Sequence, residues 1–173
     1  MRLHHGLALA GLMALSACGS ESTRTVPCPR ITLLRDGADL TRFRAGSGQD
    51  LSVMTADARL AGFEARCDFA DRNRSVTVDI TPRFTAERGP ASTTSSVDLP
   101  WFVAISDERD TRILDQLDYT ARAAFTGNQS RVVATGERVR LTLPVSDIET
   151  YNVRISFRLN AEELAYNRRR GVR

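Results

Sequence analysis

The stretch "YNVRISFRLN", residues 151–160, shows the most regular pattern of the chain. Apolar side chains occupy every second position from Tyr151 to Leu159, and polar side chains occupy the positions between them. Because successive side chains of a β-strand point to opposite faces, this pattern predicts a strand with one buried and one solvated face.

The same alternation recurs along most of the chain. In residues 53–69 it changes phase at Ala61-Gly62, which indicates a β-bulge at the glycine. Stretches rich in glycine, asparagine, serine or proline separate the runs and are typical of turns. Strands are predicted at 29–34, 53–69, 75–81, 98–106, 116–126, 138–144 and 151–160. About seven strands with this spacing predict an all-β fold, an antiparallel β-sandwich.

The segment before the last predicted strand, "LPVSDIETYNVRI" (143–155), resembles a corner found in fibronectin type III and other immunoglobulin-like domains. In those domains a leucine and a proline precede a tyrosine whose hydroxyl bonds back to the turn. Leu143, Pro144 and Tyr151 match that order, and the resemblance implies an immunoglobulin-like body. The alternative is that Tyr151 is an inward-facing aromatic residue of the core.

The amino terminus reads as an export signal. "MRLHHGLALAGLMALSAC" begins with an arginine and two histidines and continues with eleven uncharged residues, 7–17. A membrane-spanning helix needs roughly 20 apolar residues. The shorter run is therefore typical of a secretory signal peptide.

The end of that run, "LSAC", resembles the lipobox of bacterial lipoproteins. The resemblance implies cleavage before Cys18, a thioether between its sulfur and diacylglycerol, and an acylated amino terminus in a lipid bilayer. Gly19, and not an aspartate, follows the cysteine, which in such proteins implies transfer to the outer membrane with the domain in the periplasm. The alternative is an ordinary secretory peptide that leaves Cys18 as a free thiol.

The chain thus divides into four predicted parts. They are a lipoprotein signal peptide (1–17), a lipidated tether (18–29), a β-sandwich domain (30–160) and a C-terminal helix or arginine-rich tail (161–173). One hydrophobic core suffices for a domain of this size.

The cysteine count agrees with an exported protein. If Cys18 carries lipid, Cys28 and Cys67 remain as an even pair, and an oxidising compartment favours a disulfide between them. A reactive or metal-binding pair would call for close spacing or a neighbouring histidine, and the sequence offers neither.

Two side chains that many enzymes use are missing from the exported chain. The sequence contains no lysine, and both histidines, His4 and His5, lie in the predicted signal peptide. This excludes a histidine-based catalytic triad, histidine-ligated zinc or iron, a Schiff-base lysine and the lysine of a P-loop. No cofactor and no metal is therefore predicted, and "AGSGQD" (45–50) is interpreted as a flexible loop.

The densest acidic cluster is "SDERD", which contains Asp107, Glu108 and Asp110. Its oxygens could hold a calcium ion, or the cluster could be a solvated hairpin loop. Trp101 and Phe102 precede it, and together these five residues form the candidate surface for a small ligand or glycan. The alternative for Trp101 is a packing role in the core or at an edge.

The chain ends differently, with "NAEELAYNRRRGVR" (160–173). Asn160 is a candidate helix cap, and acids in the first turn with arginines in the last suit the helix dipole. From Cys18 onward the chain keeps 23 arginines and 21 acids, a net charge of +2, and without the four terminal arginines the net charge is −2. These arginines are candidate contacts to an anionic lipid or envelope polymer, or they belong to a frayed terminus: Arg168, Arg169, Arg170 and Arg173.

Together these patterns predict a membrane-anchored periplasmic lipoprotein that acts as a non-enzymatic interaction or structural module with an envelope protein as partner. The lipobox makes the chain similar to small periplasmic lipoproteins of proteobacteria, a likeness that implies no activity. Nucleic acid is not predicted as a partner, because no basic face is evident. A binding module for a small ligand or cell-wall glycan is the alternative, and a carboxylate-dependent hydrolase is a third hypothesis.

Overall fold

The computed structural model describes residues 25–171. In this range the chain forms nine β-strands and one α-helix, joined by loops and short 3₁₀ turns. The elements are β1 (Arg30–Leu33), β2 (Asp39–Phe43), β3 (Met54–Ala70), β4 (Ser75–Arg88), β5 (Ser96–Ser106), β6 (Ile113–Ala124), β7 (Arg131–Thr135), β8 (Val139–Pro144), β9 (Asn152–Phe157) and α1 (Ala161–Arg170).

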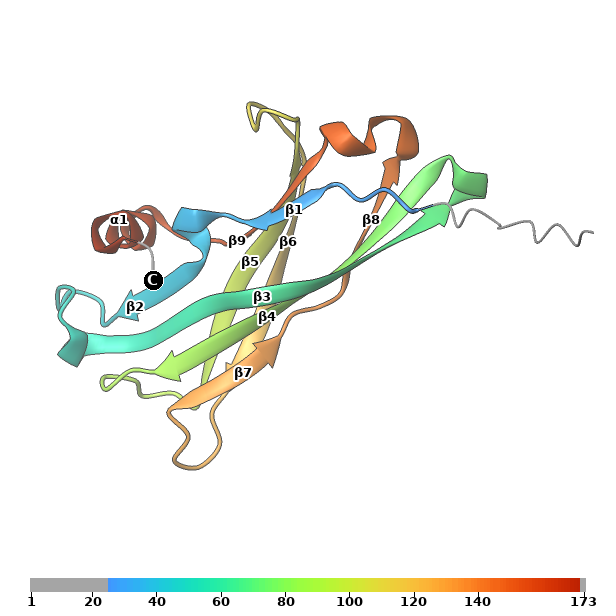
Figure 1. Ribbon diagram of the computed structural model, residues 1–173. Helices are drawn as coiled ribbons and strands as arrows, with labels where there is room; N and C mark the ends of the chain where they lie inside the picture. Colours follow the sequence, from blue (N-terminus) through green and yellow to red (C-terminus); the bar gives the residue numbers. More distant parts are fainter. Residues whose placement is uncertain (1–24, 172–173) are drawn as a thin grey trace, which may run out of the picture.

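The strands form two sheets that pack face to face (Figure 1). One sheet has the order β1-β9-β5-β6, and the other has the order β2-β3-β4-β7 with β8 also paired to β4. The long strand β4 pairs with β3 along one side, and with β8 and then β7 along the other. The predicted all-β antiparallel sandwich with a short C-terminal helix is confirmed. Only β1 departs from the antiparallel pattern, because it runs parallel to β9.

Strand β9 comes from the stretch with the most regular alternation. Its apolar side chains Val153, Ile155 and Phe157 are at most 1% exposed and lie in the core. The opposite face is more covered than the alternation predicts, because Ser156 is also buried. A Cβ atom on Gly37 would lie 1.9 Å from the Ser156 Oγ atom, so the 3₁₀ turn Arg35–Gly37 packs directly on this strand.

The predicted β-bulge in β3 is confirmed. The register with β4 shifts between Leu60 and Gly62, and Gly62 has a φ of +147°, a value that suits glycine. The extra residue changes which side chains face inward, so both halves of this long strand direct apolar residues to the core, with Leu60 before the shift and Phe63 after it.

Aromatic rings fill the centre of the sandwich. The ring centroids of Phe84 and Phe157 are 5.5 Å apart, and those of Phe84 and Trp101 are 5.9 Å apart. Gly136 lies against this group, since a Cβ atom there would be 3.1 Å from both the Phe84 and the Trp101 ring. Large rings and a small neighbour therefore fit together across the two sheets.

Tyr151 is half-buried and packs against the core. Within residues 25–171 its hydroxyl forms no hydrogen bond, so the structure shows the inward-facing aromatic residue and not the hydroxyl-bonded corner. The predicted signal peptide, Cys18 and most of the predicted tether lie outside the described residues, as does Arg173. No helix in the described part is long and apolar enough to span a bilayer.

Candidate functional site

A disulfide joins the segment before β1 to β3. The sulfur atoms of Cys28 and Cys67 are 2.06 Å apart and their Cα atoms are 5.9 Å apart, which confirms the predicted pair. The bond links the chain entering one sheet to a strand of the other. Closing a loop over a separation of 39 residues stabilises the fold by about 4 kcal/mol in the chain-entropy model.

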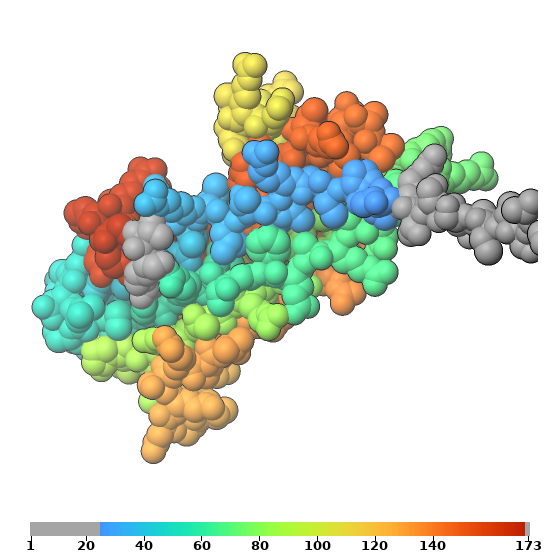
Figure 2. Space-filling view, in the orientation of Figure 1, coloured from blue at the N-terminus to red at the C-terminus, as the bar shows by residue number. Residues whose placement is uncertain are grey.

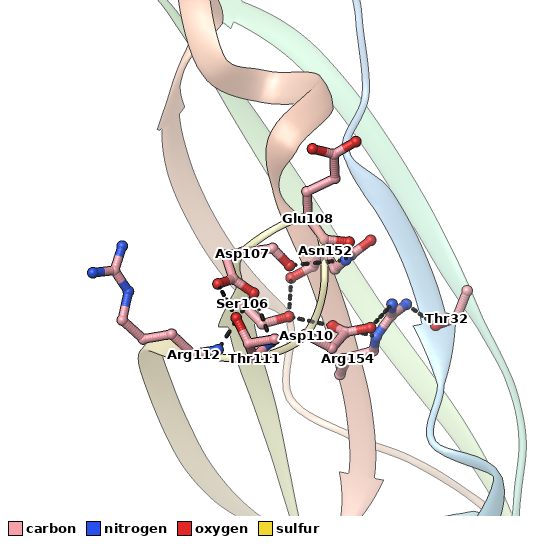
Figure 3. Close-up of polar contacts among 9 residues, drawn as sticks. All are labelled: Thr32, Ser106, Asp107, Glu108, Asp110, Thr111, Arg112, Asn152 and Arg154. Carbon is pink, nitrogen blue, oxygen red and sulfur yellow. Dashed lines mark hydrogen bonds and ion pairs between the residues drawn. The ribbon is translucent and has the colours of Figure 1, made fainter.

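The predicted acidic cluster forms the loop between β5 and β6 (Figure 3). The Asp107 carboxylate accepts hydrogen bonds from the Thr111 backbone N–H and hydroxyl, at 2.7 and 2.6 Å, and from the Arg112 backbone N–H at 3.3 Å. These bonds, the one from the Thr111 hydroxyl foremost, lower the pKa of Asp107. The carboxylate therefore closes its own loop.

Asp110 connects the same loop to β9. Its carboxylate accepts two hydrogen bonds from the Arg154 guanidinium, at 3.1 and 2.5 Å, and one from the Ser106 hydroxyl at 2.5 Å. Arg154 also donates to the Thr32 hydroxyl on β1. The hydrogen bonds from Arg154, and next those from Ser106, lower the pKa of Asp110.

Asn152, the first residue of β9, completes this polar cluster. Its buried side-chain amide donates to the backbone carbonyls of Asp107 and Glu108, at 3.0 and 2.9 Å. The Glu108 carboxylate itself points away from the other side chains in Figure 3. Residues 25–171 contain no group of three histidine, cysteine or acidic side chains placed to hold a metal ion. The carboxylates of Asp107 and Asp110 therefore hold the hairpin loop in place through hydrogen bonds.

The structure corrects the predicted role of Trp101. Its side chain is 0% exposed, and its ring stacks on Tyr119 at a centroid distance of 4.8 Å, so it cannot serve as a surface platform. Alternation alone does not show which face of β5 is covered, so the sequence left both a surface role and a packing role open, and the structure shows the packing role. Phe102 is half-buried with the Arg158 guanidinium 5.5 Å above its ring. Both residues lie along β5, whereas Asp107 lies beyond its end, so the predicted ligand surface is not brought together.

The arginines of α1 have different environments. Arg170 is 21% exposed and lies 3.2 Å from the Asp39 carboxylate and 3.7 Å from that of Asp57. Its charge therefore holds the helix to the sandwich through ion pairs within the chain. The exposed Arg168 pairs with Asp36 at 3.0 Å, and the exposed Arg169 donates to the Gln49 side-chain oxygen at 2.6 Å.

Residues 161–170 are thus packed in place as a helix and are not frayed. Asn160 and Glu163 form a reciprocal capping box at its start, as the sequence predicts for Asn160. Near its end the buried Asn167 amide donates to the backbone carbonyls of Asp36 and Asp39, at 2.8 and 2.7 Å. Sequence reasoning missed Asn167, because an asparagine within a polar helix carries no signal of burial.

A wide groove separates α1 from the loop that follows β2, with a volume of about 910 Å³. Phe43 and Tyr166, which both line it, contact each other with ring centroids 5.1 Å apart and ring planes at 71°. The glycines of the loop, Gly46 and Gly48, have positive φ angles and open space around them. Sequence reasoning interpreted this loop as flexible but missed the groove, because the helix that forms its other wall follows more than 100 residues later.

Comparison of the chain with protein-family models, with curated proteins and with solved structures found no match in any of the three. A function for this protein therefore rests on its own residues and their arrangement.

Proposed function

We propose that this protein is a lipoprotein, anchored in the outer membrane through acylated Cys18, whose β-sandwich binds another envelope protein without catalysing a reaction. The "LSAC" sequence supports the anchor. The disulfide between Cys28 and Cys67 supports export, because such bonds persist in oxidising compartments and are rare in the cytosol.

The placement of the groove carries the proposal of a binding role. The segment that leads into β1 lies at one end of the sandwich, and α1 with the loop after β2 lies at the other (Figure 1). Thr25 lies seven positions after Cys18, a distance of at most about 25 Å when the chain is extended. An anchor at Cys18 therefore favours an orientation in which the groove points away from the membrane, toward the periplasm.

The absence of histidine and lysine after the predicted signal peptide also favours binding over catalysis. The exported chain has no histidine and no lysine, and the two aspartates of its densest acidic cluster are engaged in holding their loop. Glycan binding at Trp101 is not proposed, because that ring is buried.

The anchor is tested by replacing Cys18 with serine. In cells fed a radiolabelled fatty acid, we expect label on the native protein and none on the Cys18→Ser variant, which should be soluble or unprocessed. Label that persists on the variant, or native protein that carries no label, contradicts the anchor.

The binding role is tested by co-purification from envelopes solubilised in mild detergent. The full chain with a C-terminal affinity tag should bring down one partner in near-equal amount. Ala45→Trp, which fills the groove, should lose that partner, whereas Ser130→Trp on the β6–β7 loop should keep it. Recovery of the chain alone, or equal loss with both variants, contradicts the proposal.

A further inference from the structure

We propose that the groove between α1 and the loop at residues 44–50 binds an acidic segment of the partner protein, and that Arg44 and Arg169 contact its carboxylates. This inference rests on the proposed function, because it names the chemistry of the partner at the same groove. The inference goes beyond the proposed function because it assigns the charge of the partner and names the two residues that recognise this charge.

Arg44 and Arg169 line the groove from opposite walls. Both are exposed, and within residues 25–171 neither forms an ion pair with a carboxylate. Among the described residues, the one side-chain hydrogen bond of Arg169 is to the neutral Gln49 amide, which does not neutralise the guanidinium. Guanidinium groups bind carboxylates through paired, charge-assisted hydrogen bonds.

Of the other charged residues that line the groove, Arg42 and Glu163 form an ion pair with each other and Glu162 is exposed. Arg42 lies 3.1 Å from the Glu163 carboxylate and also donates to the Asp98 carbonyl at 2.9 Å. Glu163 further accepts a bond from the Asn160 backbone N–H within the capping box. With the exposed Glu162 counted, three arginines face two glutamates, so the lining keeps a net positive charge that complements an acidic ligand.

The aromatic residues that line the groove suit a peptide more than a bare ion. Phe43 and Tyr166 provide half-buried rings on which the apolar part of a side chain or backbone can pack. Tyr166 is held between Phe43 and the Arg170 guanidinium, which lies 5.2 Å from its ring centroid. Figure 2 shows the two walls, α1 in red and the segment after β2 in cyan, at the same end of the molecule.

The position of the groove favours a protein over the anchoring membrane. It lies at the end of the sandwich opposite the segment that leads into β1. Anionic lipid headgroups carry the same kind of charge as an acidic peptide, but that bilayer would lie at the other end of the molecule. Binding to anionic vesicles is therefore an outcome that contradicts the inference.

The test measures fluorescence anisotropy of a fluorescein-labelled peptide of six glutamates, titrated with the purified full chain in detergent. A peptide of six glutamines is the uncharged comparison. We expect the glutamate peptide to bind and the glutamine peptide to bind at least roughly tenfold more weakly, and Arg44→Ala combined with Arg169→Ala to weaken the glutamate peptide roughly tenfold as well.

Two controls separate charge from folding. Arg72→Ala combined with Arg138→Ala removes two exposed arginines that lie outside the groove lining, and it should leave binding unchanged. Glu108→Gln removes a charge from the β5–β6 loop, outside the groove lining, and should likewise leave binding unchanged. Thermal unfolding of each variant verifies that it is folded.

Equal binding of both peptides, equal loss with both double arginine variants, or stronger binding to phosphatidylglycerol vesicles than to the peptide would overturn the inference. A protein that ignores the glutamate peptide but still loses its partner with Ala45→Trp would bind a partner of other chemistry. In that case the inference fails and the proposed function stands.

Discussion

At the scale of single residues, Asp110 shows how one carboxylate links a loop to the sheet. Arg154 and Ser106 donate to it, and they hold its pKa below the ordinary value. A carboxyl group with a lower pKa in the folded state stabilises the fold above its unfolded pKa, and that contribution is lost as the pH falls through the folded value.

Replacement of Asp110 by asparagine removes this contribution. At pH 7 we expect Asp110→Asn to lower the free energy of unfolding by about 1 kcal/mol, the upper range for an exposed ion pair. The difference from the native protein should shrink as the pH falls below about 4, because the carboxyl group becomes protonated first in the unfolded chain and, at lower pH, in the folded protein. Urea unfolding at several pH values measures both effects.

Glu108→Gln is the matched control, since the Glu108 carboxylate lies in the same loop and forms no hydrogen bond or ion pair with another residue of the described range 25–171. It should leave stability unchanged across the pH range. A pH-independent difference for Asp110→Asn would contradict the assignment.

Gly37 is a second single residue on which packing depends. An alanine Cβ at this position would lie 1.9 Å from the buried Ser156 Oγ atom, so Gly37→Ala should destabilise the protein by about 1–3 kcal/mol. The double variant Gly37→Ala with Ser156→Ala should recover part of that loss, because it removes the oxygen. Thermal unfolding of the three proteins decides the matter, and an unchanged Tm for Gly37→Ala would refute it.

At the scale of elements, α1 protects the outer edge of β2. Strand β2 pairs with β3 on one side only, and Asn167 of α1 donates to the Asp39 carbonyl on the other side. Uncovered sheet edges promote pairing with other chains, and covering an edge with a helix is one way to prevent this. The C-terminal helix is therefore part of the folded domain.

Asn167→Ala tests the attachment of the helix. The change leaves the carbonyls of Asp36 and Asp39 without their donor, and we expect a loss of about 2 kcal/mol in the free energy of unfolding. Arg168→Ala, at the next position, removes an exposed ion pair and should cost less than about 1 kcal/mol. Urea unfolding compares the two, and equal losses would show that Asn167 has no special role.

Strands whose sequence alternates between apolar and polar residues were predictable, and the others were not. In β8 and β4 the alternation matches burial, because one face is more open to water than the other, whereas β9 alternates in sequence but is buried on both faces. β2 lacks alternation, because Asp39, Leu40 and Thr41 are all buried. The two polar residues are buried under α1, where Asp39 pairs with Arg170 and Thr41 donates a hydrogen bond to Asp57. A prediction from sequence assigns polar residues to the surface, so it misses those that are buried together with their hydrogen-bonding or charged partners.

At the scale of the whole molecule, the disulfide joins the two sheets near the end where the chain enters. Replacing Cys28 and Cys67 together by alanine should lower the free energy of unfolding by about 2–4 kcal/mol. Dithiothreitol should reproduce the effect in the native protein and leave the variant unchanged. A variant as stable as the native protein would mean that the bond does not contribute to stability.

The candidate site belongs to this scale too, which explains why the sequence did not reveal it. The groove brings together residues 41–55 and 160–169, and no local pattern links these segments. The surface predicted from neighbouring residues, Trp101 to Asp110, is divided between the core and a hairpin loop. Adjacency in the chain is a poor guide in a sandwich, because alternate side chains of a strand point to opposite faces.

Photo-crosslinking in intact cells tests most directly whether the groove is the binding surface. Amine-reactive reagents are unsuitable, since the chain has no lysine. A photoreactive side chain is placed at Ser47 in the groove loop, at Ser130 in the β6–β7 loop, and at Arg74 in the β3–β4 hairpin near the entry of the chain. We expect a discrete crosslinked partner from Ser47 and none from the other two positions. Equal crosslinking from all three positions, or none from Ser47, would contradict the account.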